Sequence, residues 1–359
     1  MSSYWSPLVH SLNPYIPGEQ PKVDGLIKLN TNENPYPPAP GVAQLLQRPE
    51  TAERLRLYPD PNSQSLKDAI ADYHQLTPDQ VFTGNGSDDV LAMAFMGLLK
   101  HSRPIMFPDI TYSFYPVYCQ LFGIEYQQIP LGDDFSLTLD DYSADNGGII
   151  FANPNAPTGL ALTLEPIEAL LRRNTNSVVV VDEAYVDFGA ESAVALIDRF
   201  PNLLVVQTLS KSRSLAGMRL GFAAGQAHLI EALNRVKNSF NPYPIDRIAE
   251  AAGRIAIQDE AYFSSCCQKI MSTRQATSDA LIELGFEVLP SKTNFLFARP
   301  PVGLEAAQLS ERLRQDKVLI RYFNKPRIDG YLRISIGTDA DMAVMLNFVR
   351  GYLSGPSAD

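Results

Sequence analysis

Cysteine and histidine are scarce in this chain of 359 residues, and each shortage excludes a class of protein. The three cysteines, Cys119, Cys266 and Cys267, are odd in number and two of them are adjacent. They therefore do not indicate the disulfide framework of a small secreted domain. The four histidines are scattered, without cysteine or carboxylate neighbours at the spacing of metal ligands. We expect no metal site.

Basic clusters and long apolar runs are absent as well. Thirty basic residues stand against forty acidic ones, and the net charge of −10 argues against nucleic acid as a partner. No segment approaches the roughly 20 apolar residues of a membrane span. The first residues lack the basic and then apolar order of a secretory signal. We expect a cytoplasmic protein that binds neither nucleic acid nor a membrane.

Composition and periodicity divide the chain into three parts. Residues 1–50, rich in proline and asparagine, predict an extended N-terminal arm. Residues 51–261 alternate between helical and strand patterns, which predicts an α/β domain with a mostly parallel sheet sandwiched by helices. Residues 262–359 predict a smaller α+β domain. The seven strands expected in the large domain are 80–83, 104–107, 125–131, 148–152, 177–181, 203–208 and 219–224. Ser63 and Thr338 are expected to cap helices.

Two of these strands end near side chains that can do chemistry. Lys211 follows the strand 203–208, and Asp182 follows the strand 177–181. Ligands bind at the carboxyl ends of strands in such sheets. A lysine amine, with an ordinary pKa of about 10.4, can lose its proton beside another cation and form a Schiff base with a carbonyl. An amine and a buried carboxylate are what pyridoxal phosphate requires, for its aldehyde and its pyridine nitrogen.

Two further turns follow other strands. In Thr83-Gly-Asn-Gly-Ser-Asp88, glycines let backbone N–H groups converge at the start of a helix, which suits a phosphate. Taken alone, the segment favours an ordinary strand-to-helix turn over a phosphate site. In Asn153-Pro-Asn-Ala-Pro-Thr-Gly159, the asparagines can hydrogen-bond a phenolic oxygen.

Together these motifs resemble the fold-type I pyridoxal-phosphate aminotransferases of class II, and among them the histidinol-phosphate aminotransferases. The resemblance runs from about residue 10 to the C-terminus. The segments that carry it, besides the two turns above, are Leu29-Asn-Thr-Asn-Glu-Asn-Pro35, Tyr58-Pro-Asp-Pro61, Asp182-Glu-Ala-Tyr-Val-Asp-Phe188, Thr208-Leu-Ser-Lys-Ser-Arg-Ser-Leu-Ala-Gly-Met-Arg219 and Leu332-Arg-Ile-Ser-Ile-Gly-Thr338.

The resemblance implies a role for each matching residue. Lys211 would form the Schiff base and move the proton, Asp182 would keep the pyridine nitrogen protonated, and Tyr185 would contact the phenolic oxygen. Tyr112 would stack on the ring. The phosphate would be held by Ser87, Asp88, Thr208, Ser210 and Arg219, with Tyr58 reaching it from the other subunit of a homodimer.

One position departs from the family pattern. Ala156 stands where an asparagine usually precedes Pro-Thr-Gly. The contact to the ring oxygen then falls to Asn155, to Asn153 or to Tyr185 alone, and Asn155 is our candidate.

Arginines carry the substrate prediction. The resemblance implies that Arg333 binds a substrate carboxylate or phosphate, since a guanidinium suits either anion. Arg321 is either a second clamp or a solvated charge at a strand end, and Tyr15 in the arm would close over the same group. Two converging arginines favour a phosphorylated substrate. The resemblance then implies that L-histidinol phosphate and 2-oxoglutarate are converted to imidazole-acetol phosphate and L-glutamate, in histidine biosynthesis.

Other functions remain open on the same scaffold. An aromatic amino-acid aminotransferase or a threonine-phosphate decarboxylase would use the same cofactor residues. A regulator's effector-binding domain would need an appended DNA-binding module, for which the arm is too short and not basic. A nicotinamide dehydrogenase would need the glycine fingerprint, which the sequence lacks, and would leave Lys211 unexplained.

Overall fold

Seven strands form one large sheet in the order β2-β8-β7-β6-β5-β3-β4 in the computed structural model, which describes residues 3–142 and 145–354. Only β8 runs antiparallel to its neighbours, so the predicted mostly parallel seven-stranded sheet is confirmed. The strands are β2 (Val81–Asn85), β3 (Ile105–Pro108), β4 (Tyr126–Ile129), β5 (Gly148–Ala152), β6 (Val179–Asp182), β7 (Leu203–Thr208) and β8 (Leu220–Gly225).

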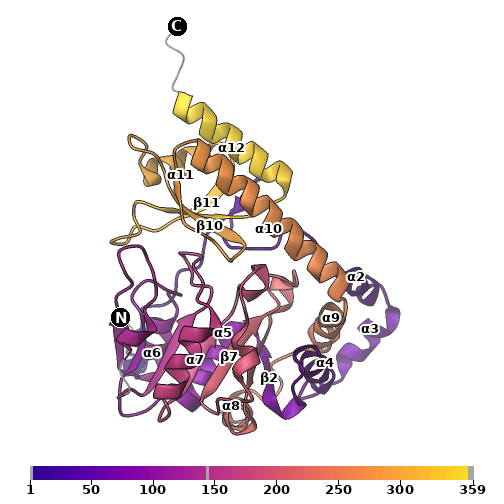
Figure 1. Cartoon of the computed structure of the whole chain (residues 1–359). Helices are drawn as coiled ribbons and strands as arrows, with labels where there is room; N and C mark the ends of the chain where they lie inside the picture. Colours follow the sequence, from indigo (N-terminus) through magenta and orange to yellow (C-terminus); the bar gives the residue numbers. More distant parts are fainter. Residues whose placement is uncertain (1–2, 143–144, 355–359) are drawn as a thin grey trace.

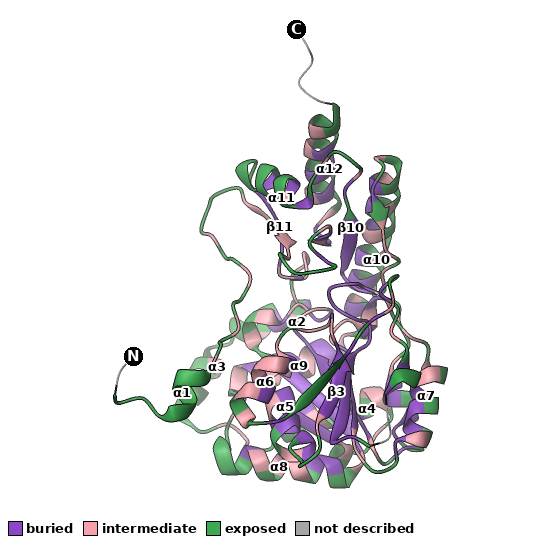
Figure 2. Cartoon of the chain, turned by 90° about the vertical axis from the view of Figure 1, so that its left-hand side faces the viewer, coloured by how far each residue is buried: buried purple, intermediate pink, exposed green. Residues whose placement is uncertain are grey.

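Helices cover both faces of this sheet, which explains why its central strands are apolar without alternation. In β7, Leu204 and Val206 face one hydrophobic cluster, whereas Leu203 and Val205 face another. The first cluster lies under α5 (Ser87–Ala94), α6 (Tyr115–Phe122) and α8 (Ala227–Phe240), and the second under α7 (Leu164–Arg173). Figure 2 shows the buried strands between α5 and α6 on one side and α7 on the other.

A further group of helices packs beside β2 and β8. These are α2 (Pro40–Leu46), α3 (Pro49–Glu53), α4 (Gln64–His74) and α9 (Arg247–Gln258), which Figure 1 shows together at one side of the molecule. The long helix α10 (Glu260–Glu283) leads from this group to the second sheet.

The second sheet has five strands in the order β1-β11-β12-β10-β9. It comprises β9 (Glu287–Val288), β10 (Phe295–Arg299), β11 (Val318–Tyr322) and β12 (Leu332–Ser335), packed by α10, α11 (Ala306–Gln315) and α12 (Asp339–Ser354). Its edge strand β1 (Ile27–Leu29) comes from the N-terminal arm and pairs in parallel with β11. The arm also contains α1 (Pro7–Ser11) and α2, so it is not extended throughout. The boundaries of the predicted domains stay a prediction.

The two predicted helix caps differ in outcome. The Thr338 hydroxyl accepts the N–H of Asp341 at 3.2 Å while the Asp341 carboxylate accepts the N–H of Thr338 at 2.9 Å, which confirms this cap of α12. The cap predicted at Ser63 is wrong, because Ser63 adopts a left-handed conformation (φ 46°) and its side chain makes no capping bond. Asp60 replaces it by accepting the N–H of Gln64 at 3.0 Å.

Gly221 gives a prediction about stability. A Cβ atom there would lie 2.3 Å from the backbone nitrogen of Ser87 and 2.5 Å from the carbonyl carbon of Gly86. Because backbone atoms cannot swing aside, we expect Gly221→Ala to lower the free energy of unfolding by about 1–3 kcal/mol, measured as the urea midpoint. Gly351→Ala in α12 is the control, since no atom lies within 4 Å of its Cβ position. Equal midpoints for the two variants would contradict this account of β8.

Candidate functional site

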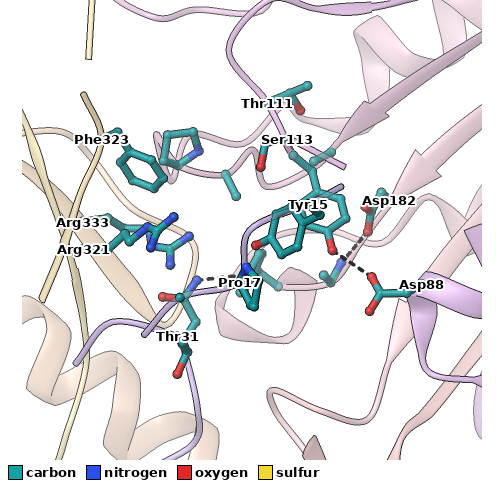
Figure 3. A pocket seen from close by; sticks show the side chains of 18 of the residues that line it. Tyr15, Pro17, Thr31, Asp88, Thr111, Ser113, Asp182, Arg321, Phe323 and Arg333 are labelled. Atoms are coloured by element: carbon teal, nitrogen blue, oxygen red, sulfur yellow. Dashed lines mark hydrogen bonds between the residues drawn. The ribbon is translucent and has the colours of Figure 1, made fainter. Parts of the chain in front are cut away.

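A cavity of about 870 Å³ lies between the carboxyl ends of the large sheet's parallel strands and the second sheet. Its wall brings together residues from both sheets and from the N-terminal arm, as Figure 3 shows in close-up. The predicted site residues that line it are Tyr15, Ser87, Asp88, Tyr112, Asp182, Tyr185, Thr208, Ser210, Lys211, Arg219, Arg321 and Arg333.

Lys211 lies just after β7 with its amine directed to the arm. Its Nζ donates a hydrogen bond to the carbonyl oxygen of Thr31 at 3.0 Å. Burial, reinforced by the positive charge of Arg333, lowers the pKa of the Lys211 amine to about 8. Roughly a tenth of this amine is thus neutral at pH 7, far more than for an ordinary lysine, and the neutral form is the one that a nucleophile or a general base requires.

Asp182, the last residue of β6, is a buried carboxylate whose hydrogen-bond donors are neutral groups. It accepts the Tyr115 hydroxyl at 2.9 Å and the N–H of Ala184 at 3.3 Å. None of the salt bridges found among the described residues includes it. Burial accordingly raises the pKa of Asp182 to about 6. A buried carboxylate that lines a cavity and lacks a cationic partner fits a protonated ring nitrogen.

Sequence reasoning missed Tyr115. Its hydroxyl belongs to a set of three tyrosines spaced by three residues, each of which bonds an acidic residue at the cavity. Tyr112 donates to the carboxylate of Asp88 at 2.8 Å, and Tyr118 donates to the main-chain carbonyl of Asp88 at 2.8 Å. Tyr115 and Tyr118 lie about one turn apart on the same side of α6, and Tyr112 lies just before this helix. That spacing was the available signal.

The turn before α5 has the shape of an anion site. Gly86 has a positive φ of 85°, and a Cβ there would lie 2.6 Å from the guanidinium of Arg219. Arg219 pairs with the Asp88 carboxylate at 3.2 Å, so a cation lies beside the first turn of a helix whose N–H groups lack partners within the helix. Because the glycine lets the Arg219 guanidinium approach the backbone of this turn, the turn fits a phosphate.

Arg321 and Arg333 stand directly opposite each other on the antiparallel strands β11 and β12. Their guanidinium carbons lie 5.3 and 5.5 Å from the centre of the Phe323 ring. Arg333 donates to the carbonyl of Asn30 at 2.7 Å, but its buried Nε has no partner among the described residues. Like charges on facing residues of a sheet repel. An anion bound between them would remove that repulsion.

Tyr15 and Tyr185 lie at two further walls of the cavity. The Tyr15 ring packs against Phe114 with ring centres 4.9 Å apart. The Tyr185 hydroxyl accepts a hydrogen bond from the Asn32 side chain at 2.9 Å, and its ring packs edge-on against Phe295. Asn32 is a second residue that sequence reasoning missed, although it belongs to a quoted motif.

The structure does not bring Asn155 or Tyr58 to the cavity wall. The Asn155 amide donates to the Ile110 carbonyl at 3.0 Å and to the Thr158 hydroxyl at 3.1 Å, whereas Ala156 lines the cavity. The geometry therefore disfavours Asn155 as the contact to a ring oxygen. Tyr58 is 79% exposed and stacks on Tyr243, 4.9 Å between ring centres.

Two other properties of the described residues bear on function. No cluster of three or more His, Cys, Asp or Glu side chains within residues 3–142 and 145–354 has the geometry of a metal site. None of the helices there is long and apolar enough to cross a membrane.

Comparison with known proteins finds aminotransferases along nearly the whole chain. Residues 24–349 match the family profile of the class I and II aminotransferases. The chain is 60% identical over 353 residues to histidinol-phosphate aminotransferase 2 of Dechloromonas aromatica, covering 98% of this chain and 99% of that one. It is 56% identical over 358 residues to histidinol-phosphate aminotransferase 1 of Methylococcus capsulatus, covering 100% of both.

Solved aminotransferase structures share the fold of this chain. The crystal structure of histidinol-phosphate aminotransferase from Sinorhizobium meliloti in complex with pyridoxal-5'-phosphate superposes with a TM-score of 0.86 at 25% identity, covering 98% of this chain and 99% of that one. An aspartate aminotransferase from Thermus thermophilus, 19% identical, shares the fold with a TM-score of 0.80, covering 97% and 99%.

The lowered pKa of the Lys211 amine should determine how the rate of its reaction with pyridoxal phosphate depends on pH. Added to cofactor-free protein, pyridoxal phosphate should be captured at Lys211 at a rate that rises roughly tenfold per pH unit below about pH 8 and then levels off. Borohydride trapping followed by peptide mass spectrometry measures this rate, with Lys211→Ala as the control. A rate that levels off only near the ordinary lysine pKa of 10.5 would show that the amine is not perturbed.

Proposed function

Because the chain belongs to the class I and II aminotransferases, and to the histidinol-phosphate aminotransferases among them, we propose that its cavity transfers the amino group of L-histidinol phosphate to 2-oxoglutarate. The products are imidazole-acetol phosphate and L-glutamate. The observation that carries this function is the meeting of Lys211 and Asp182 with two opposed arginines in one cavity. The first pair serves the cofactor, and the arginines serve the substrate.

Pyridoxal phosphate is the cofactor, and the residues present fit it. When bound, it supplies an aldehyde that captures amines and a ring that accepts electrons when a proton leaves the substrate's α-carbon. Asp182 would hold the proton at its pyridine nitrogen, and Tyr112 would cover the ring. The turn at Ser87, with Arg219, would hold the phosphate, and Tyr185 would contact the ring oxygen.

Lys211 would serve as the base that acts on the substrate's α-carbon. An amine with a pKa near 8 can remove the α-proton and later give it back, because such a pKa lies close to the working pH. The amine is 3.0 Å from the Thr31 carbonyl, a neutral acceptor that orients it without adding a counter-charge.

Arg321 and Arg333 would bind the phosphate of histidinol phosphate, and Tyr15 would close over it. Two guanidinium groups suit a doubly charged oxyanion better than a single carboxylate. The unpartnered Nε of Arg333 and the absence of a carboxylate partner for either arginine among the described salt bridges support this role.

We also propose a cytoplasmic homodimer in which Tyr58 reaches the partner's cofactor phosphate. Exposed aromatic residues support this assembly, since Tyr58, Phe240 and Tyr243 are 79%, 75% and 41% exposed. Contiguous exposed apolar groups are typical of protein interfaces. A sedimentation mass equal to one chain of 39.6 kDa would refute the dimer.

The direct test of the function follows glutamate formation from 2-oxoglutarate with histidinol phosphate as the amino donor. The purified holoenzyme should turn over, and Lys211→Ala should lose at least about 10²–10⁴-fold in kcat, since it lacks the positioned base. Release of carbon dioxide from threonine phosphate, without transamination of histidinol phosphate, would instead identify a decarboxylase. Faster turnover of phenylalanine or tyrosine would identify an aromatic aminotransferase.

Arg321→Leu should separate phosphate recognition from the chemistry. Removing one charged hydrogen-bond donor costs about 1.5–3 kcal/mol, so kcat/KM for histidinol phosphate should fall roughly 10- to 150-fold. L-Histidinol, which lacks the phosphate, is the matched control substrate, and its weak turnover should be unchanged. An equal loss on both substrates would mean that Arg321 supports the fold of β11 and does not bind the phosphate.

A further inference from the structure

Asn32 is a buried residue whose four polar groups all have partners. Its backbone is left-handed, with φ at 54°, and only 1% of the residue is exposed. Its N–H donates to the Ser335 hydroxyl at 2.9 Å, and its carbonyl accepts the Asn294 side chain at 3.0 Å. The Ser335 hydroxyl donates to Asn32 Oδ1 at 2.8 Å, and Asn32 Nδ2 donates to the Tyr185 hydroxyl at 2.9 Å.

These bonds fix where each proton points. The Ser335 hydroxyl accepts the main-chain N–H of Asn32 and donates its one proton to Oδ1, and the amide NH₂ of Asn32 points toward Tyr185. The Tyr185 oxygen accepts from that NH₂, and its own proton must therefore point elsewhere. Burial raises the pKa of Tyr185, so this phenol keeps its proton. Since Tyr185 lines the cavity, the proton is available there.

The neighbouring loop offers no competing donor. Ala156, which lines the cavity, has no amide, and the Asn155 amide is bonded to Ile110 and Thr158. The Asn153 side chain makes two hydrogen bonds to the main chain of Leu162: its Nδ2 donates to the carbonyl at 3.3 Å, and its Oδ1 accepts the N–H at 2.8 Å. A ring oxygen bound in the cavity therefore depends on Tyr185.

We propose that Asn32 is a positioning residue that directs the Tyr185 proton onto the ring oxygen of pyridoxal phosphate, compensating for the amide that Ala156 lacks. The proposal rests on the proposed function, because it requires the cofactor to bind in this cavity. A donor at the ring oxygen stabilises the oxygen's negative charge and so favours loss of the proton from the nitrogen that links Lys211 to the cofactor.

Asn32→Asp tests this with the smallest change in shape. Asparagine and aspartate both tolerate a left-handed backbone, and the remaining oxygen still accepts from Ser335. The carboxylate oxygen that replaces the amide NH₂ accepts a hydrogen bond from the Tyr185 hydroxyl, and this bond draws the phenol proton away from the cavity. The pKa of the lysine–cofactor linkage, read from holoenzyme absorbance against pH, should rise by roughly one unit, the value of one hydrogen bond.

A double-mutant cycle with Tyr185→Phe separates the positioning effect from the added charge. The new carboxylate raises this pKa through its charge in either background, but the effect carried by the phenol proton exists only when Tyr185 is present. We expect a clearly smaller shift from Asn32→Asp in the Tyr185→Phe protein. Equal shifts in both backgrounds would overturn the proposal.

If Asn32→Asp does not fold or retain cofactor, Asn32→Gly replaces it, since glycine accepts the backbone angle and adds no charge. This variant should raise the linkage pKa in the presence of Tyr185 and leave it unchanged in Tyr185→Phe. A shift of the same size in both backgrounds would again overturn the proposal. Failure of the proposed function is distinguishable, because it would appear as a lack of histidinol phosphate turnover by the unsubstituted protein, whereas this test reads only the absorbance of the bound cofactor.

Discussion

The site depends on a short stretch of main chain, residues 30–34, that lies between the two sheets and supplies neutral hydrogen-bond acceptors to buried cations. The carbonyl of Asn30 accepts from Arg333, and that of Thr31 accepts from Lys211. The Asn34 side chain donates to the carbonyls of Lys211 and Ser212 at 2.9 and 3.2 Å. The carbonyl groups of Asn30 and Thr31 accept hydrogen bonds from Arg333 and Lys211 without adding a negative charge beside them. A carboxylate in the same place would favour the protonated amine and hold the lysine in its unreactive form.

Asp182, Arg321 and Arg333 line the cavity, and none of them has an oppositely charged partner among the salt bridges of the described residues. Asp182 is buried with neutral donors, and two arginines face each other on adjacent strands. Such arrangements disfavour the folded state, and local violations of good packing are expected at functional sites. The apolar layers on both faces of the large sheet supply the stability that offsets them.

The part of the site that the sequence predicts is the part governed by local pattern. Lys211 and Asp182 follow apolar strands, and parallel strands bring their carboxyl ends to one edge, so their meeting followed from the pattern and the geometry of the sheet. The bond from Tyr115 to Asp182 and the bond from Asn32 to Tyr185 join residues 67 and 153 positions apart. No periodicity within a segment encodes such pairings.

The orientation of side chains within loops could not be predicted from the sequence either. Asn155 and Ala156 are adjacent, yet only Ala156 faces the cavity, because the path of this turn decides which side chain points inward. At Ser63, residue type favoured a cap, but the left-handed backbone turned the hydroxyl away and Asp60 took its place. β1, with three residues, is too short to show the alternation by which a strand is recognised.

The parallel pairing of β1 with β11 has a consequence for how the molecule is made. Ile27 lies beside Val318, so β1 pairs with a strand that is synthesised long after it. The large sheet, built from residues 81 to 225, can assemble while synthesis continues, since domains generally fold as units from the N-terminal end. Residues 30–34 follow β1 directly and reach their final positions only with it. The protein therefore cannot complete its reactive centre before β11 has been translated.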